Sequence, residues 1–180
     1  MADIAYREEF AIPRHRTDWG AIWGGLFVFL SIWAVFGALG LAIFASTASP
    51  NATNPVLGMS WGIGAWFIVL TIIAFYVAGR ETGHLAAVNN RHDGLVHGLI
   101  MFGLSFAALV MLFSIGGRVL TSSAAGIGGV RTSYLISVFT DLGWIGFVGL
   151  FLGWLAAMFG ASSGVLHKAD RNVREIRPAA

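Results

Sequence analysis

Long apolar runs separated by short polar stretches dominate the pattern of this chain. Three segments lack Asp, Glu, Lys and Arg altogether: 19–79, 94–117 and 142–167. Each is longer than the roughly 20 apolar residues with which a helix crosses the hydrocarbon core of a bilayer. The pattern therefore predicts membrane-spanning helices and not a soluble domain.

Two turn-like stretches divide the chain further. The sequence STASPNATNP at 46–55 contains Pro and Asn, which favour turns over helix interiors. The sequence TSSAAGIGGVRTS at 121–133 is rich in Gly and Ser and predicts a loop. We therefore expect an all-α membrane protein, an up-down bundle of four transmembrane helices at about 19–45, 57–80, 94–117 and 136–164. Amphipathic rings that suit the membrane interface lie near these helix ends: Trp19, Trp23, Trp61, Trp66, Tyr76 and Trp144.

Lys and Arg are distributed unequally between the two sides of such a bundle. The side with both termini and the connection between the second and third helices carries nine of them, whereas the other side carries two, Arg118 and Arg131. Because cytoplasmic loops are enriched in Lys and Arg, both termini are predicted to be cytoplasmic. The expected organisation is a cytoplasmic segment at 1–18, a transmembrane domain at 19–167 and a basic cytoplasmic tail at 168–180.

The composition agrees with a membrane protein and narrows its chemistry. Hydrophobic residues make up 57% of the chain and charged residues 11%, against about 45–50% and about 25% in soluble domains. The basic residues flank apolar runs, so the net charge of +2 indicates lipid headgroups as partners and not nucleic acid. The absence of cysteine excludes thiolate metal sites and thiol nucleophiles. No phosphate loop, nucleophile elbow or dinucleotide fingerprint is found, and we expect no enzyme activity.

Small residues form a stripe along one face of the last predicted helix. They recur at spacings of three and four, which permits close approach of another helix in lipid: Gly146, Gly149, Gly153, Ala157, Gly160 and Gly164. The partner can be the first helix, a second copy or another protein. The segments 17–38 and 140–161 also share Thr-Asp at their starts and Phe-Gly-Ala at their ends. An inverted repeat would give such a likeness, but we favour coincidence, because the alphabet of membrane helices is restricted and no proline breaks any predicted span.

Three charges are predicted on the outer side: Arg118, Arg131 and Asp141. Because Thr140 and Asp141 directly precede an apolar run, Asp141 is expected to cap the last helix. The alternative is a place in an ion path, since an ionisable group near the membrane interior often has a function.

The connection between the second and third helices contains a polar cytoplasmic cluster: Glu81, His84, His92, Asp93 and His97. Imidazole and carboxylate groups can bind a metal or relay protons, but the spacing matches no established metal motif. Asp93 is expected to cap the third helix. His97 alone lies inside a predicted span, so it is the candidate axial ligand if the protein carries haem or chlorophyll; otherwise no cofactor is expected.

The chain resembles a family of small uncharacterised bacterial inner-membrane proteins with four helices. The resemblance covers about residues 17–116, less clearly the last helix, and is carried by four motifs: Trp19-Gly20-Ala21, Gly62-Ile63-Gly64-Ala65-Trp66, Ala78-Gly79-Arg80 and Asp93-Gly94-Leu95-Val96-His97-Gly98-Leu99. It implies a multi-pass protein of the bacterial cytoplasmic membrane and no particular activity. It also implies that Asp93-Gly94 and His97-Gly98 form one unit.

These observations favour a non-catalytic structural or accessory subunit that acts by helix packing. Its partners would be the lipid bilayer and other membrane subunits or copies of itself. A small oligomeric channel or transporter is the first alternative, although mid-span hydroxyl groups are few: Ser31, Thr71, Ser105 and Ser114. A subunit that carries haem or chlorophyll in an electron-transfer or photosynthetic complex is the second.

Overall fold

The computed structural model describes residues 17–47, 55–86, 88, 90–124 and 132–176. Four helices make up this part of the chain: α2 (Trp19–Thr47), α3 (Pro55–Leu85), α4 (Arg91–Ala124) and α5 (Thr132–Ile176). Each contains a span that is long and apolar enough to cross a membrane: Trp19–Phe44, Gly62–Leu85, Arg91–Leu112 and Gly143–Leu166. The prediction of an all-α, four-helix membrane protein is confirmed, and the chain is a multi-pass membrane protein.

The helices are longer than the sequence pattern predicts, chiefly at α4 and α5. α4 continues to Ala124 and α5 begins at Thr132, so 121–124 and 132–133 of the predicted loop are helical, whereas 125–131 lie outside the described residues. The helical part contains serine and threonine, whose hydroxyl groups can bond to carbonyl oxygens of their own helix. α5 also runs on to Ile176, through most of the predicted tail at 168–180, where Lys, Arg and Glu are good helix formers.

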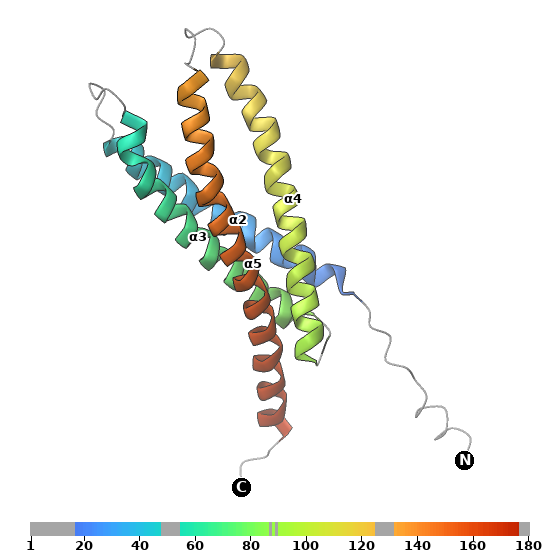
Figure 1. Cartoon of the computed structure of the whole chain (residues 1–180). Helices are drawn as coiled ribbons and strands as arrows, with labels where there is room; N and C mark the ends of the chain where they lie inside the picture. Colours follow the sequence, from blue (N-terminus) through green and yellow to red (C-terminus); the bar gives the residue numbers. More distant parts are fainter. Residues whose placement is uncertain (1–16, 48–54, 87, 89, 125–131, 177–180) are drawn as a thin grey trace, which may run out of the picture.

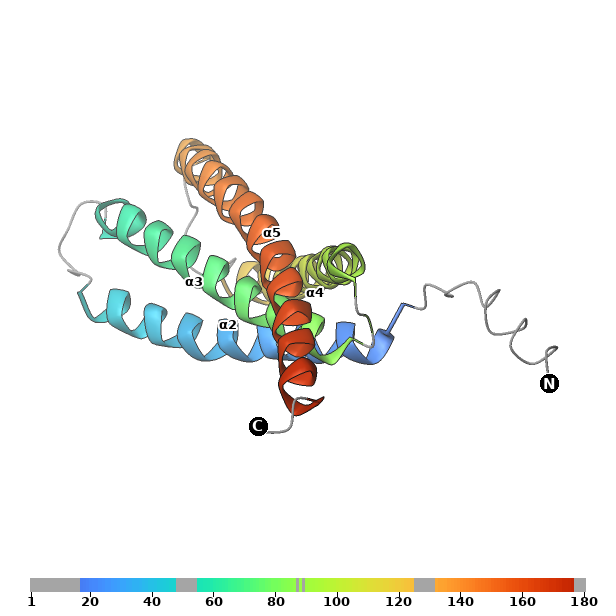
Figure 2. The same cartoon turned by 90° about the horizontal axis from the view of Figure 1, so that it is seen from below.

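The start of α2 and the end of α5 lie at the same end of the bundle (Figure 1). α2 and α3 lie side by side as an antiparallel pair, and α5 crosses this pair obliquely (Figure 2). α3 contacts each of the other three helices, and its interface with α5 is the largest in the bundle. Over the described residues α2 and α5 do not touch, so α3 is the central helix.

Aromatic and aliphatic side chains fill the interior where α2, α3 and α4 meet. The rings of Phe29 and Phe75 stack with centroids 4.1 Å apart, and Phe102 approaches Phe75 at 4.9 Å. Ile22 and Met101 are also fully buried in this core. Such ring pairs stabilise a core by about 0.5–1.5 kcal/mol beyond the burial of their area.

Glycine residues bring the backbones of α3 and α5 into direct contact. A methyl group added at Gly160 would meet the carbonyl oxygen of Tyr76, and one added at Gly164 would meet that of Arg80. The arrangement is reciprocal, because a methyl group at Gly79 would collide with the carbonyl oxygen of Ala157. In lipid, contact of this kind replaces the hydrophobic force that packs soluble helices.

The small-residue stripe of α5 therefore packs against α3 of the same chain over most of its length. Gly149 lies against Ile68, Gly153 lies against Phe75, and Ala157 is fully buried. Gly146 is the exception, since nothing lies within 4 Å of the place where its Cβ would be.

α4 joins the same crossing through two further glycines. A Cβ at Gly98 would lie 2.7 Å from the Cβ of Ala161 and 2.8 Å from the carbonyl oxygen of Ala157. A Cβ at Gly94 would lie 2.7 Å from Val165. Three helices thus meet at one region of α5, a crossing that only small residues permit.

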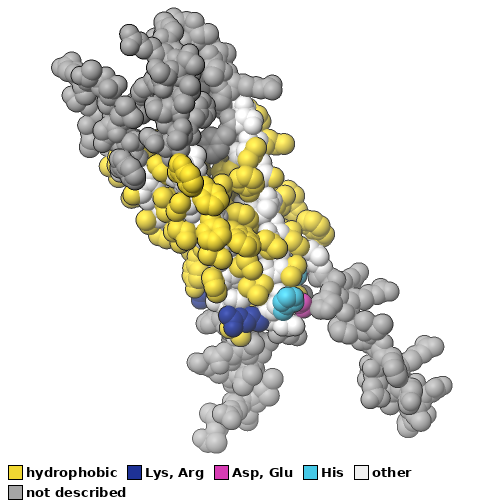
Figure 3. All heavy atoms as spheres, in the orientation of Figure 1, with side chains coloured by type: hydrophobic (Ala, Val, Ile, Leu, Met, Phe, Trp, Pro, Cys, Tyr) yellow, Lys and Arg dark blue, Asp and Glu magenta, His cyan; other side chains and the backbone are white. Residues whose placement is uncertain are grey.

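Hydrophobic side chains form a belt across the middle of the bundle on the face seen in Figure 3. The charged and histidine side chains that the structure describes lie at the end of the bundle where α2 starts and α5 ends, here called the polar end: Asp18, Arg80, Glu81, His84, Arg91, His92, Asp93 and His97. The described belt between the two ends contains none of these residue types, as a lipid environment requires.

Candidate functional site

Asp18 is the N-cap of α2, the first element of a polar junction between α2 and α4. Its carboxylate oxygen Oδ1 accepts a hydrogen bond from the main-chain N–H of Ala21 at 3.3 Å. Its carbonyl oxygen accepts the first helical hydrogen bond, from Ile22 at 3.2 Å. Asp is favoured at this position because its side chain satisfies an otherwise unpaired N–H group.

Asn90 is the N-cap of α4, and the prediction that Asp93 fills this position is wrong. The side-chain oxygen of Asn90 accepts a hydrogen bond from His92 N–H at 3.1 Å, and its carbonyl oxygen accepts one from Gly94 N–H at 3.1 Å. Asp93 lies in the first turn of α4. A carboxylate there is stabilised by the partial positive charge of the helix N-terminus.

His97 connects these two capped helix starts. The side chain is buried, with 4% of its surface exposed. Its Nε2 atom accepts a hydrogen bond from the main-chain N–H of Asp18 at 3.0 Å. Its Nδ1 atom lies 2.8 Å from the carbonyl oxygen of Asp93. Both nitrogens therefore have main-chain partners, one on each helix.

These partners determine the protonation state of the ring in this arrangement. The N–H group of Asp18 can only donate, so Nε2 of His97 must carry a lone pair. The carbonyl oxygen of Asp93 can only accept, so Nδ1 must carry the proton. His97 is thus a neutral imidazole in the Nδ1–H form.

The surrounding glycines explain why the junction forms here. Gly94 and Gly98 let α4 approach α5, while His97 faces α2 from the same two turns of helix. Gly25 of α2 lies against Thr82 of α3, and a Cβ there would come within 3.1 Å of Met101. The segment Asp93–Gly98 thus supplies both a polar contact and a packing contact.

The rest of the predicted polar cluster does not converge on one point. Glu81 and His84 are half-buried on α3, and His92 is exposed on α4. Among the residues that the structure describes, no three His, Asp or Glu side chains are placed so that they could hold a metal ion. Within the cluster, the contact that we find is that of His97 with the main chain of Asp93.

The arrangement of His97 also bears on the candidate haem or chlorophyll. An axial ligand donates a nitrogen lone pair to the metal, and the lone pair of Nε2 accepts the hydrogen bond from Asp18. The hydrogen bond between Asp18 N–H and Nε2 would have to break before Nε2 could bind a metal. The residues present therefore do not fit this cofactor as they stand.

Two of the three predicted outer-side charges fall at the opposite end, Arg118 in α4 and Asp141 in α5. Arg131 lies outside the described residues. Since α5 begins at Thr132, Asp141 is inside the helix, and the prediction that it caps this helix is wrong. The side chains of Arg118 and Asp141 also lie outside the described part.

The mid-span hydroxyl groups do not gather into a polar lining. Ser31 and Ser114 are exposed and donate to carbonyl oxygens of their own helices, at 2.8 Å and 2.7 Å. Ser105 is buried with its hydroxyl 3.4 Å from the sulfur of Met101, and Thr71 lies against Gly153 through its methyl group. Serine and threonine hydroxyl groups in membrane helices commonly form such hydrogen bonds with carbonyl oxygens of their own helix.

Two sets of residues were missed by sequence reasoning. Asp18 was not identified, although Thr17-Asp18 before an apolar run is the same capping signal that was assigned to Asp141. Gly79 and Gly83 were also missed, although their spacing of four is the usual signal for helix contact.

Comparison of the chain with protein-family models, with curated proteins and with solved structures finds no match in any of the three.

Proposed function

We propose that this chain is a non-catalytic structural or accessory subunit of a bacterial inner-membrane complex. It would act by packing a preformed helix bundle against a transmembrane helix of another subunit, either a second copy of this chain or a different protein. Two features support the proposal: close helix packing inside the bundle and a row of aromatic side chains on its outer surface.

The inner surface supports a role in packing. α3 and α5 meet backbone to backbone at Gly160 and Gly164, and α4 closes on α5 at Gly98. The buried hydroxyl groups of Thr82 and Ser162 bond to carbonyl oxygens of their own helices. An interior of this kind supports a rigid scaffold more readily than a reaction site, which would need convergent polar groups.

The observation that carries the proposal is an aromatic seam on α5, exposed at Trp144, Phe147 and Phe151 and half-buried at Trp154. These four residues follow the alternating spacing of three and four typical of helices that pack side by side. Successive ring centroids lie 6.2, 6.3 and 5.9 Å apart.

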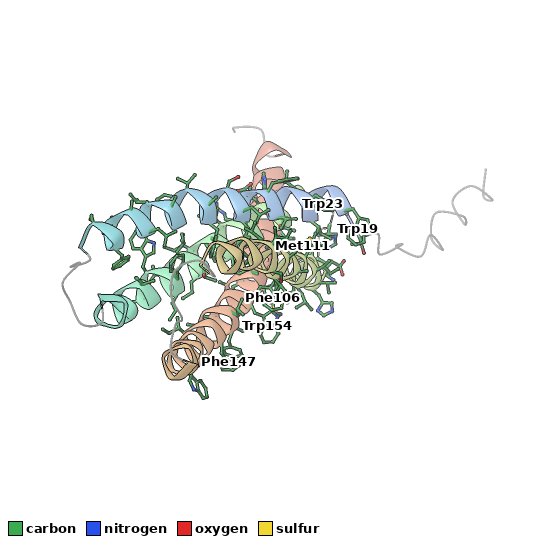
Figure 4. The ribbon with its side chains drawn as sticks, turned by 90° about the horizontal axis from the view of Figure 1, so that it is seen from above. Trp19, Trp23, Phe106, Met111, Phe147 and Trp154 are labelled. Carbon is green, nitrogen blue, oxygen red and sulfur yellow. The ribbon has the colours of Figure 1, made fainter. Side chains whose placement is uncertain are left out.

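The seam is directed outward. Phe147 and Trp154 project from the side of α5 that faces away from α3 (Figure 4). Trp144 is 69% exposed and Phe147 is 61% exposed, even though the opposite face of α5 is buried against α3. Aromatic residues are enriched where proteins contact one another, and this face is free to receive a partner helix.

Site-directed photo-crosslinking in native membranes tests this proposal. A photoreactive phenylalanine analogue at Phe147 should yield a discrete protein adduct. The same analogue at Ile73, which is 52% exposed on α3 outside the seam, is the matched control and should yield far less. An adduct of twice 19.2 kDa would identify a second copy as the partner, and another mass would identify a different subunit. Absence of any protein adduct at Phe147 would contradict the proposal.

A further inference from the structure

Among the described side chains, His97 is the ionisable one that is buried, and it joins two helices only in its neutral form. We propose that His97 is a proton-sensitive latch between α2 and α4. The latch is closed while Nε2 accepts the hydrogen bond from Asp18, and it opens when Nε2 takes up a proton. This inference is independent of the proposed role as an accessory subunit.

The first step is the chemistry of the contact. Nε2 of His97 and the main-chain nitrogen of Asp18 are 3.0 Å apart with a single hydrogen between them. In the imidazolium form both ring nitrogens carry protons and neither has a lone pair. Two N–H groups would then point at each other across 3.0 Å. The contact with Asp93 survives, because Nδ1 donates in both forms.

The second step is the placement of the ring. His97 lies beside the first turn of α2 and within the second turn of α4. Helix N-termini carry partial positive charge, so an added proton places a like charge beside both. Protonation therefore removes the hydrogen bond from Asp18 N–H and places a positive charge beside the two helix starts, where the carboxylates of Asp18 and Asp93 also lie.

The extent of the movement follows from the other contacts of α2. Gly25 remains packed against Thr82 of α3, and Phe29 remains stacked on Phe75. These contacts involve no titratable group. Ile22 is also fully buried in the core, so the segment that the latch releases is the start of α2, from Asp18 to about Gly20.

Other titratable and charged groups at the polar end must be separated from His97 in any test. On the helices around it they are Asp18 on α2, Arg80, Glu81 and His84 on α3, and Arg91, His92 and Asp93 on α4, whereas the described side chains of α5 contribute none. Protonation of Nε2 is favoured as the pH falls, so the latch closes towards high pH and opens towards low pH.

Distance measurement by electron paramagnetic resonance tests the latch. The chain has no cysteine, so spin labels at Thr17→Cys and Met111→Cys are unique. Met111 is 67% exposed on α4, about 20 Å along the helix from His97 at about 1.5 Å per residue. We expect a single narrow distance at pH 8 and a second, longer distance that grows reversibly towards pH 5.

Two variants show whether His97 causes the pH-dependent change in distance. His97→Gln keeps an acceptor and a donor but cannot be protonated, so its distance should not change with pH. The double variant His84→Gln/His92→Gln should respond as the parent protein does. A parent distance that is independent of pH, or a response that persists in His97→Gln, would overturn the proposal.

A measurement on the unaltered histidine covers the case in which His97→Gln fails to fold. Nitrogen NMR of the ¹⁵N-histidine-labelled protein should show the Nδ1–H form of His97 at pH 8. Protonation of Nε2 should then occur over the pH range in which the longer distance appears. A neutral Nε2–H form, or a ring that stays neutral while the distance changes, would refute the latch.

Discussion

The main-chain N–H of Asp18 donates a hydrogen bond to Nε2 of His97 over 3.0 Å, although 79 positions separate the two residues in the chain. Through this bond the capped start of α2 is held against α4. The bond also gives a structural role to a buried histidine that the sequence presents as a candidate ligand.

Replacing His97 by Leu should lower the free energy of unfolding by about 1–3 kcal/mol, the usual cost of leaving a buried donor without its partner. The N–H of Asp18 loses its acceptor in this variant. His92→Leu is the matched control, because His92 is exposed and only its main chain takes part in the cap of α4. Unfolding by denaturing detergent in mixed micelles measures the free energy of unfolding of both variants. Equal stability of the two variants would contradict the importance of the bond.

Two glycines of the same stripe should respond in opposite ways to Ala. Gly160→Ala places a methyl group against the carbonyl oxygen of Tyr76 and should destabilise the bundle by about 1–3 kcal/mol, as overpacking does. Gly146→Ala meets nothing within 4 Å and should be neutral, or stabilising by up to about 1 kcal/mol through helix propensity. The melting temperature of each purified variant is the measurement, and a loss at Gly146 equal to that at Gly160 would count against the α3–α5 crossing.

Cysteine labelling should show the starts of α2 and α4 on the cytoplasmic side. Single cysteines at Thr17 and His92 should react with a membrane-impermeant maleimide only after the membrane is opened, whereas one at Ser46, at the other end of α2, should react in intact cells. The expected orientation follows from the excess of Lys and Arg at the polar end. The reverse labelling pattern would show that the protein has the opposite orientation in the membrane.

The purified protein should show neither a Soret band nor a chlorin band. Both ring nitrogens of His97 form hydrogen bonds with main-chain groups. His97 could therefore act as an axial ligand only if its hydrogen bond with Asp18 were broken. An absorption spectrum of protein extracted in mild detergent makes the measurement. A band that disappears in His97→Leu would show that a pigment displaces Asp18.

The membrane-spanning nature of the helices followed from the sequence because charge-free runs of spanning length have one physical explanation. Their number followed once the Pro- and Asn-containing stretch 46–55 divided the longest run into two. The ends of the helices were harder to predict. Gly and Ser between 121 and 133 suggested a loop, yet 121–124 and 132–133 are helical, because serine and threonine hydroxyl groups can bond to carbonyl oxygens of their own helix. The capping signal at Thr140-Asp141 was equally ambiguous, because two residues do not distinguish the start of a helix from its interior.

The partners of individual side chains could not be predicted in the same way. His97 was recognised as unusual, but its acceptor role depends on Asp18, and nothing in the spacing of the two residues indicates that they meet. Trp66 looked like an interface anchor, whereas its indole N–H donates to the carbonyl oxygen of Phe36 at 3.3 Å. The sequence likewise did not show which helix packs against the small-residue stripe of α5, and the structure shows that this helix is α3.

The mass of the particle in its native state tests the proposed role most directly. Protein extracted from its own membrane in mild detergent, measured by native mass spectrometry, should contain the 19.2 kDa chain together with further copies or with another membrane subunit in fixed ratio. Phe147→Ala combined with Phe151→Ala should reduce this assembly, because it removes the centre of the aromatic seam. A parent protein that is strictly monomeric, with no protein accompanying it, would contradict the account.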